Sequence, residues 1–188
     1  DEFLVIARSG RPQPGRPTAR VGERLPNLPF LGPLHWAWAP EEEFTSWLSH
    51  GDMSPAQLEF FRQAVTTVRS RGYSVACVGK ALERLQEPLL RMAETPHDIA
   101  LRNQVRQLIG ELSQDELQLL QVEAGQRYRV SHIAAAVFDP KGRIALEISL
   151  VGIRRRLSAA DISDWSHRVR ASALQVTREI KGRPPQSA

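Results

Sequence analysis

Histidine, serine and cysteine are the residues of this chain that could act as bases, nucleophiles or metal ligands, and their spacing argues against these roles. No H-E-x-x-H pair, G-x-S-x-G turn or glycine-rich phosphate loop occurs. Ser131 and His132 are adjacent, but neighbours in a strand point to opposite faces, so we expect no nucleophile–base hydrogen bond between them. The sequence therefore predicts that the protein is not an enzyme and holds no metal or cofactor. The histidines are scattered: His35, His50, His97, His132 and His167.

Cys77 is the single cysteine among 188 residues, which excludes an internal disulfide and a multi-cysteine zinc site. Because Val75 and Val78 flank it, we interpret Cys77 as a small apolar core residue rather than a redox sensor. A chain of this length can bury a full core without disulfides, and 41% hydrophobic with 24% charged residues is typical of a globular protein. We expect a cytoplasmic protein without a signal peptide or membrane association.

The net charge of +4 invites a nucleic-acid-binding interpretation, but the distribution of basic residues weakens it. Of the 25 basic residues, 22 are arginines, a bias that we attribute to a GC-rich genome. The densest run, Arg154-Arg155-Arg156, is interpreted as a solvated connection between a strand and a helix rather than a phosphate clamp. Since no aromatic residues interleave with the arginines, this chain is not itself expected to bind nucleic acid.

The order of elements predicts an α+β fold with an antiparallel sheet flanked by helices. Two strands joined by the turn Asp139-Pro140-Lys141-Gly142 form a hairpin, and Ser54 and Ser158 each have the sequence signature of a helix cap. A parallel doubly wound sheet is excluded because strands and helices do not alternate. The expected elements are strands at 3–9, 73–78, 128–138 and 143–151, an irregular proline-rich segment at 18–39, helices after Pro40, Ser54 and Ser158, and a helical segment at 80–121.

Aromatic residues cluster in and beside the proline-rich segment, and two interpretations of them stay open. They can pack in the core, or they can form the wall of an apolar ligand pocket beneath a loop that covers the sheet. The residues concerned are Phe30, Trp36, Trp38 and Trp47.

Several short motifs resemble, in order, the effector-binding domain of IclR-type transcriptional regulators. Val130–Arg143 matches the first strand and turn of that domain's C-terminal hairpin, and Ile148–Gly152 matches its second strand. Val21–Pro26 is similar to the segment before the family's pocket loop, and Arg71–Val75 to its helix-to-strand step. The likeness spans most of the chain, from Phe3 to Ile180.

The resemblance implies a GAF-like domain that senses a small-molecule effector and assembles into homodimers or homotetramers. It implies an effector-binding domain over residues 1–181 with a helical insertion at about 80–121, a flexible tail at 182–188, and a missing N-terminal winged helix-turn-helix that binds promoter DNA. Positions carried over from the family are Leu31, Gly32, His132, Ser149 and Val151, and the aromatic wall adds Phe30 and Trp36. His132 is equally compatible with a satisfied core position.

Departures from the family pattern concern the effector. The loop Pro26–Pro33 is shorter and lacks the family's lysine, Val151 replaces a second serine, and the helical insertion and Ala37-Trp38 point to an actinobacterial-like branch. Fewer polar donors and more aromatic wall predict a larger, more apolar effector, such as an aromatic acid. The alternative is an oligomerisation or interaction module with a vestigial pocket.

Overall fold

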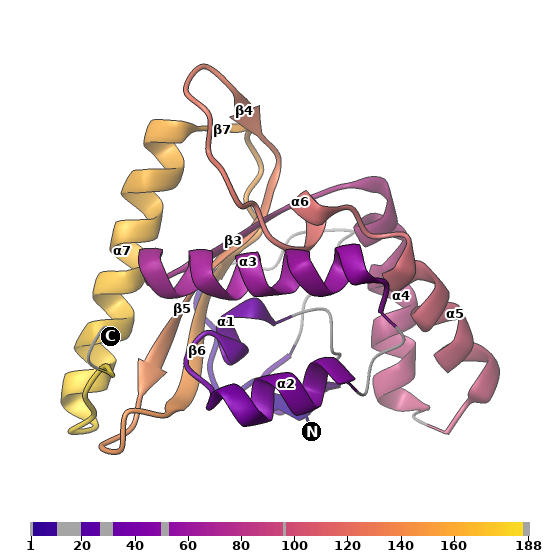
Figure 1. The fold of residues 1–188 in the computed structure, drawn as a ribbon, viewed down its shortest axis with the longest axis horizontal. Helices are drawn as coiled ribbons and strands as arrows, with labels where there is room; N and C mark the ends of the chain where they lie inside the picture. Colours follow the sequence, from indigo (N-terminus) through magenta and orange to yellow (C-terminus); the bar gives the residue numbers. More distant parts are fainter. Residues whose placement is uncertain (1, 11–19, 27–31, 50–52, 96, 186–188) are drawn as a thin grey trace. The chain divides into compact units, whose positions relative to one another are not determined.

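The chain divides into two compact units, each described separately below. The computed structural model describes residues 2–10, 20–26, 32–49, 53–95 and 97–185 (Figure 1). Unit 1 comprises Asp1–Leu31 and Val78–Ser113, and unit 2 comprises Gly32–Cys77 and Gln114–Ala188. Helices accompany antiparallel strands, so the predicted α+β class is confirmed.

Unit 1 contains a two-stranded antiparallel sheet and two helices. Strands β1 (Glu2–Leu4) and β2 (Arg24–Pro26) pair with each other, and Val5 continues the backbone pairing with Glu23 and Gly22. The predicted strand over 3–9 was therefore too long, because the partner strand turns away at Gly22, which has a φ of +88°. Helices α4 (Lys80–Glu94) and α5 (Ile99–Gly110) pack together, and Asp98 caps α5 by accepting a hydrogen bond from the Leu101 N–H.

The predicted helical segment 80–121 divides between the two units. Helices α4 and α5 belong to unit 1, whereas the short helix α6 (Gln114–Leu117) belongs to unit 2 and packs against β3 (Ser74–Cys77). After α6 the Leu119 N–H donates to the Val75 carbonyl oxygen at 2.7 Å. The buried Gln118 side chain accepts a hydrogen bond from the Ser74 hydroxyl at 2.6 Å.

The main sheet of unit 2 has the strand order β3-β5-β6, and both pairings are antiparallel. Strands β5 (Val130–Phe138) and β6 (Ile144–Val151) form the predicted hairpin. Gly142 has a φ of +77°, and Asp139 accepts hydrogen bonds from the Lys141 and Arg143 N–H groups. The turn residues thus fix the register of the hairpin.

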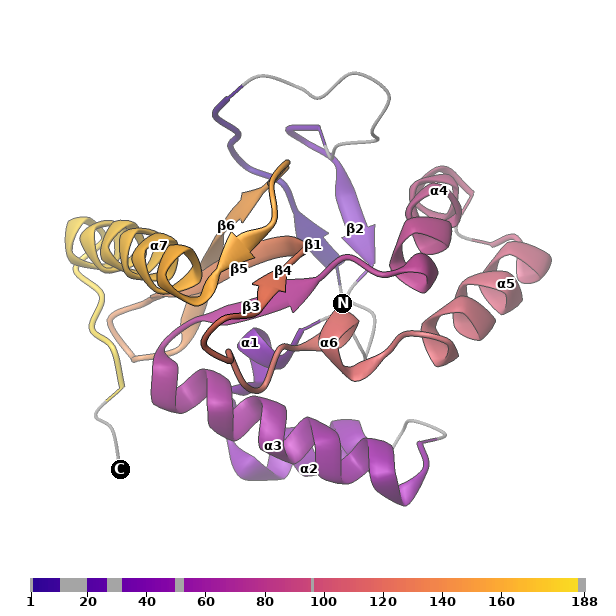
Figure 2. The same ribbon diagram turned by 90° about the horizontal axis from the view of Figure 1, so that it is seen from above.

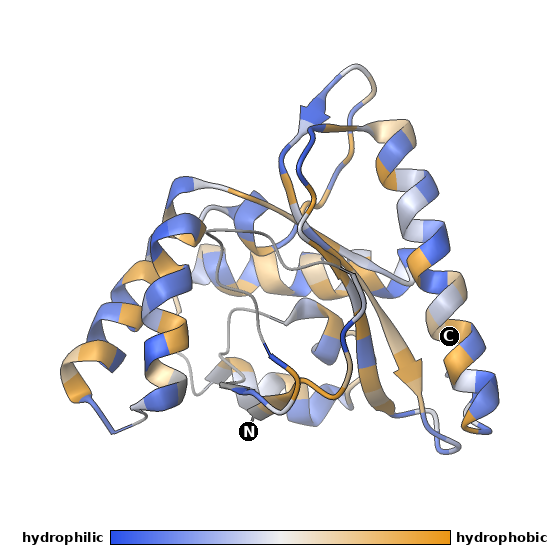
Figure 3. Cartoon of the chain, turned by 180° about the vertical axis from the view of Figure 1, so that it is seen from behind, coloured by the Kyte–Doolittle hydropathy of each residue, from blue (hydrophilic) through white to orange (hydrophobic). Residues whose placement is uncertain are grey.

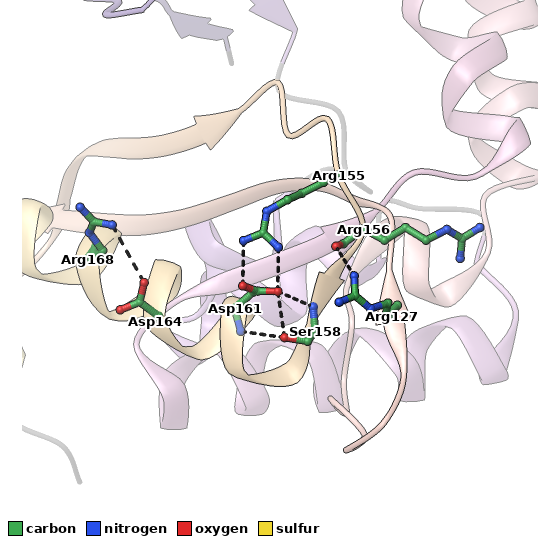
Figure 4. Close-up of polar contacts among 7 residues, drawn as sticks. All are labelled: Arg127, Arg155, Arg156, Ser158, Asp161, Asp164 and Arg168. Atoms are coloured by element: carbon green, nitrogen blue, oxygen red, sulfur yellow. Dashed lines mark hydrogen bonds and ion pairs between the residues drawn. The ribbon is translucent and has the colours of Figure 1, made fainter.

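Helix α7 (Ala159–Glu179) covers one face of this sheet (Figure 2). Ser158 caps its N-terminus, as the sequence predicted, and forms a reciprocal capping box with Asp161 (Figure 4). Hydrophobic and hydrophilic residues alternate along the helix, which is typical of a helix with one buried side (Figure 3). Its buried residues join those of β3, β5, β7 (Leu157–Ser158) and the segment after α6 in one core: Val75, Leu119, Val130, Ile133, Ala135, Val137, Leu157, Ile162, Val169 and Ala173.

Three helices from the first half of the chain complete unit 2. They are α1 (Pro33–Trp36), α2 (Glu41–Ser49) and α3 (Pro55–Arg71). Ser54 and Gln57 form the predicted capping box of α3, and Gly72 ends this helix in the left-handed conformation at φ +78°. Helix α1 packs against α3 and β5.

The C-terminal end of α7 is tied to the end of β5. The Gly182 N–H donates to the Thr177 carbonyl oxygen at 2.7 Å, and the Arg183 N–H donates to the Asp139 carbonyl oxygen at 3.2 Å. The first two residues of the predicted tail are thus hydrogen-bonded to folded elements, while residues 186–188 lie outside the described part of the chain.

Gly182→Ala should destabilise the protein by about 2 kcal/mol or more, because a Cβ at this position would overlap the Phe138 carbonyl oxygen. The measurement is the free energy of unfolding from urea titration. Gly110→Ala is the control, since a Cβ there meets open space, and it should change that free energy by less than about 0.5 kcal/mol. Equal effects of the two substitutions would contradict the close approach at Gly182.

Candidate functional site

A β-bulge in β5 changes the direction in which its side chains point. Ala76 pairs with His132, but the next residue of β3, Cys77, pairs with Val130, so Ser131 is an extra residue without its own partner. Val130 and Ile133 both lie in the core beneath α7. Ser131 and His132, between them, therefore both point to the opposite face of the sheet.

The bulge makes the sequence-based expectation about Ser131 and His132 wrong. Their side chains form a hydrogen bond, with 3.1 Å between Ser131 Oγ and His132 Nδ1. Strict alternation would have separated them, but a bulge places two consecutive side chains on one side of the strand. A hydroxyl and an imidazole in contact are the first requirement of a nucleophilic site, which further needs donors for the developing oxyanion.

The sheet face opposite α7, here called the α1 face, collects three residues of β6. In the antiparallel register Val151 lies opposite His132, Ser149 opposite Ala134, and Glu147 opposite Ala136. The structure thus brings together His132, Ser149 and Val151, three of the residues that the sequence proposed for the site. Glu147 was missed, although period-two spacing from Ser149 places it on the same face. Its carboxylate accepts a hydrogen bond from the Ser149 hydroxyl.

Helix α1 adds a second histidine. The Glu147 carboxylate raises the pKa of both His35 and His132, which places both imidazoles within electrostatic reach of it. No sequence motif marked His35, because its placement depends on α1 packing against β5. Within the described residues, no group of three or more acidic, histidine or cysteine side chains is arranged to hold a metal ion.

Burial controls the protonation of these histidines. It lowers the pKa of His132 and of His35, and the opposing effect of Glu147 is smaller in both cases. Both imidazoles are therefore neutral at pH 7, and each offers one donor and one acceptor. Together with two serine hydroxyls and the Glu147 carboxylate, they give the α1 face many hydrogen-bonding groups.

The aromatic residues of this region pack mainly against one another. Trp36 stacks on Trp47 with ring centroids 4.8 Å apart, and Phe44 of α2 lies against both rings. Successive residues of a helix point about 100° apart, which lets Trp36 pack against α2 while His35 reaches towards Glu147. Trp38 makes an edge contact with Phe138 at the end of β5.

The remaining predicted site residues lie near the start of α1 or beyond the described residues. Gly32 is buried at the N-cap of α1. Phe30 and Leu31 lie outside the part of the chain that the structure describes.

Cys77 is half-buried at the end of β3 and packs against the core beneath α7. Burial raises the pKa of its thiol to about 11, with further contributions from Asp115 and Glu116. The thiol is therefore protonated at neutral pH, which disfavours reaction with oxidants and agrees with a packing role.

The free energy of unfolding should fall as the pH decreases below about 6.5, because the unfolded chain then binds protons that the half-buried His132 and His35 bind less readily in the folded state. His132→Gln should make this pH dependence shallower between about pH 6.5 and 5. Urea titrations at several pH values measure it. Ser172→Ala, at an exposed position of α7 that carries no titratable side chain, is the control and should keep the wild-type slope. An unchanged slope in the His132 variant would contradict a buried, neutral imidazole.

The overall fold resembles that of a known repressor. A structure titled "Crystal Structure of Agobacterium tumefaciens repressor BlcR" superposes with a TM-score of 0.50 and 19% sequence identity. The match covers 90% of this chain and 52% of the repressor chain, so the chain spans about half the length of that protein. No family model and no curated protein matches the sequence.

In the described residues, no helix is both long enough and apolar enough to cross a membrane. The likeness to the repressor shows the fold alone, because the sequence identity is low. We conclude that the chain has the GAF-like α+β fold expected from its sequence, an antiparallel sheet flanked by helices, and that part of the Agobacterium tumefaciens repressor has a similar fold.

Proposed function

We propose that the chain is the small-molecule-sensing domain of an IclR-type transcriptional regulator. The observation that carries this proposal is the group of hydrogen-bonding side chains on the α1 face, where β5, β6 and α1 contribute His132, Ser149 and His35. The likeness of the fold to part of a repressor supports the regulatory setting. In this proposal, promoter DNA is bound by a winged helix-turn-helix outside this chain, and effector binding changes the arrangement of subunits in a homodimer or homotetramer.

The charges of the α1 face indicate which effectors it favours. Glu147 is anionic and both imidazoles are neutral at pH 7, so an ionised carboxylic acid meets no positive charge among these groups. A large, apolar effector that donates hydrogen bonds suits the face better. An aromatic acid would bind with uptake of a proton by an imidazole, and its affinity would rise as the pH falls.

A panel of aromatic and aliphatic ligands, with and without a carboxyl group, tests the proposal by thermal shift and calorimetry. A ligand at 100 times its Kd should stabilise the chain by about 2.7 kcal/mol. Ser149→Ala removes one hydrogen-bonding group and should weaken binding about fivefold, which corresponds to about 1 kcal/mol. Ser172→Ala, on the exposed side of α7, is the matched control and should bind like the wild type.

A panel without any stabilising ligand would favour the alternative, an oligomerisation module with a vestigial pocket. The edge strand β6 offers one specific reason to keep that alternative, since Val151 and Leu150 are 58% and 36% exposed. Light scattering tests whether an assembly uses this strand, because Leu150→Lys should dissociate an oligomer formed through β6 and leave an oligomer formed elsewhere intact. The ligand panel distinguishes the two functions, since the proposed sensor is also an oligomer.

A further inference from the structure

Two arginine-rich segments that lie far apart in the sequence meet beside the N-terminus of α7. Strand β4 (Arg127–Tyr128) pairs with β7, with Arg127 opposite Ser158 and Tyr128 opposite Leu157. This pairing brings the segment 127–129 alongside the segment 154–156. The Arg127 guanidinium group donates a hydrogen bond to the Arg156 carbonyl oxygen at 3.5 Å (Figure 4). The sequence alone showed only the run at 154–156 and could not reveal the second segment beside it.

The core sets the direction of these arginines. Leu157 is fully buried and Tyr128 packs against the core beneath α7, so the residues next to them on each strand point the other way. Arg127, Arg129 and Arg156 are exposed, as this alternation requires. Arg154, in the connection from β6, is exposed as well. We call three of these residues the arginine surface: Arg127, Arg154 and Arg156.

Most of the positive charge on this surface is not neutralised by neighbouring carboxylates. Asp161 is occupied by Arg155, which binds both of its carboxylate oxygens at 2.9 and 2.7 Å, and by the Ser158 cap. Among the residues that the structure describes, no carboxylate pairs with Arg154 or Arg156. Arg127 donates to a backbone carbonyl oxygen, which leaves its charge in place.

We propose that the arginine surface contacts the phosphate backbone of double-stranded DNA. Guanidinium groups bind phosphate oxygens through paired hydrogen bonds, and exposed arginines without carboxylate partners are free to do so. Tyr128, the aromatic residue next to Arg127 in β4, is half-buried, and its hydroxyl accepts a hydrogen bond from the Glu123 N–H. It is therefore not available as a stacking platform for unpaired bases, which favours a duplex over a single strand.

The choice of DNA as the duplex rests on the proposed function, since a domain tethered to a DNA-binding domain experiences a high local concentration of duplex DNA. Contact with the backbone carries no sequence information, so this surface would add affinity and orientation rather than specificity. It would also be independent of the α1 face, because the two are formed by different residues.

The test measures binding of this chain to a fluorescent random-sequence duplex by anisotropy over a series of salt concentrations. Each lost phosphate contact lowers the slope of log K against log salt concentration by about 0.9, so Arg154→Ala/Arg156→Ala should lower it by about 1.8. The double variant Arg154→Lys/Arg156→Lys should keep most of the slope because it keeps the charge. Arg62→Ala/Arg178→Ala removes the same charge from exposed positions on α3 and at the far end of α7, and should keep the wild-type slope.

Three results would overturn the proposal. They are equal slopes in the two alanine variants, tighter binding to a single strand of the same length, and binding to anionic lipid vesicles without binding to the duplex. Circular dichroism on each variant separates a lost contact from a lost fold. Ligand binding is measured separately, so the two proposals can fail independently. If the arginine surface does not bind the duplex, the proposed sensing function is unaffected. If the chain binds the duplex but no ligand of the panel, the DNA-contact proposal is unaffected.

Discussion

The alternation of side chains along β5 determines which residues of unit 2 face the core beneath α7 and which lie on the α1 face. Ile133, Ala135 and Val137 point into the core beneath α7, and His132 points to the other face. The extra residue at Ser131 interrupts this alternation once, so that Val130 also reaches the core. Without the bulge, either Val130 or Ile133 would leave the core. Burial of those two side chains, at about 1.5–3 kcal/mol each, therefore also fixes where the polar residues lie.

The polar chemistry of the α1 face follows from that arrangement. His132 can be buried at low cost because it is neutral and because its Nδ1 has a hydrogen-bonding partner in Ser131. Glu147 stays at the exposed edge strand, where water can solvate its charge. The result is a surface that presents hydrogen-bond donors and acceptors rather than a net positive charge. This electrostatic character differs from that expected of a binder of small anionic acids.

Local sequence patterns predicted the parts of the fold that depend on local chemistry. The helix caps at Ser54 and Ser158 and the hairpin turn at 139–142 were confirmed because each is specified by a few neighbouring residues. The bulge at Ser131 and the pairing of β4 with β7 were missed, since both depend on partners far away in the chain. The place of His35 and the length of β1 were not predicted for related reasons. His35 reaches the α1 face only through tertiary packing, and β1 ends where β2 turns away.

The points at which the chain leaves and re-enters unit 2 affect how long the segment between them can be. The chain leaves after Cys77 and returns at Gln114, and the two boundaries are anchored to each other through the backbone bond from Leu119 to Val75 and the Ser74–Gln118 contact. Because the two ends are held close together, the cost of closing the intervening segment grows only slowly with its length. The segment between Cys77 and Gln114 can therefore be replaced by segments of very different length. Such an exchange, by recombination or by laboratory grafting, would keep the strand register of unit 2 intact.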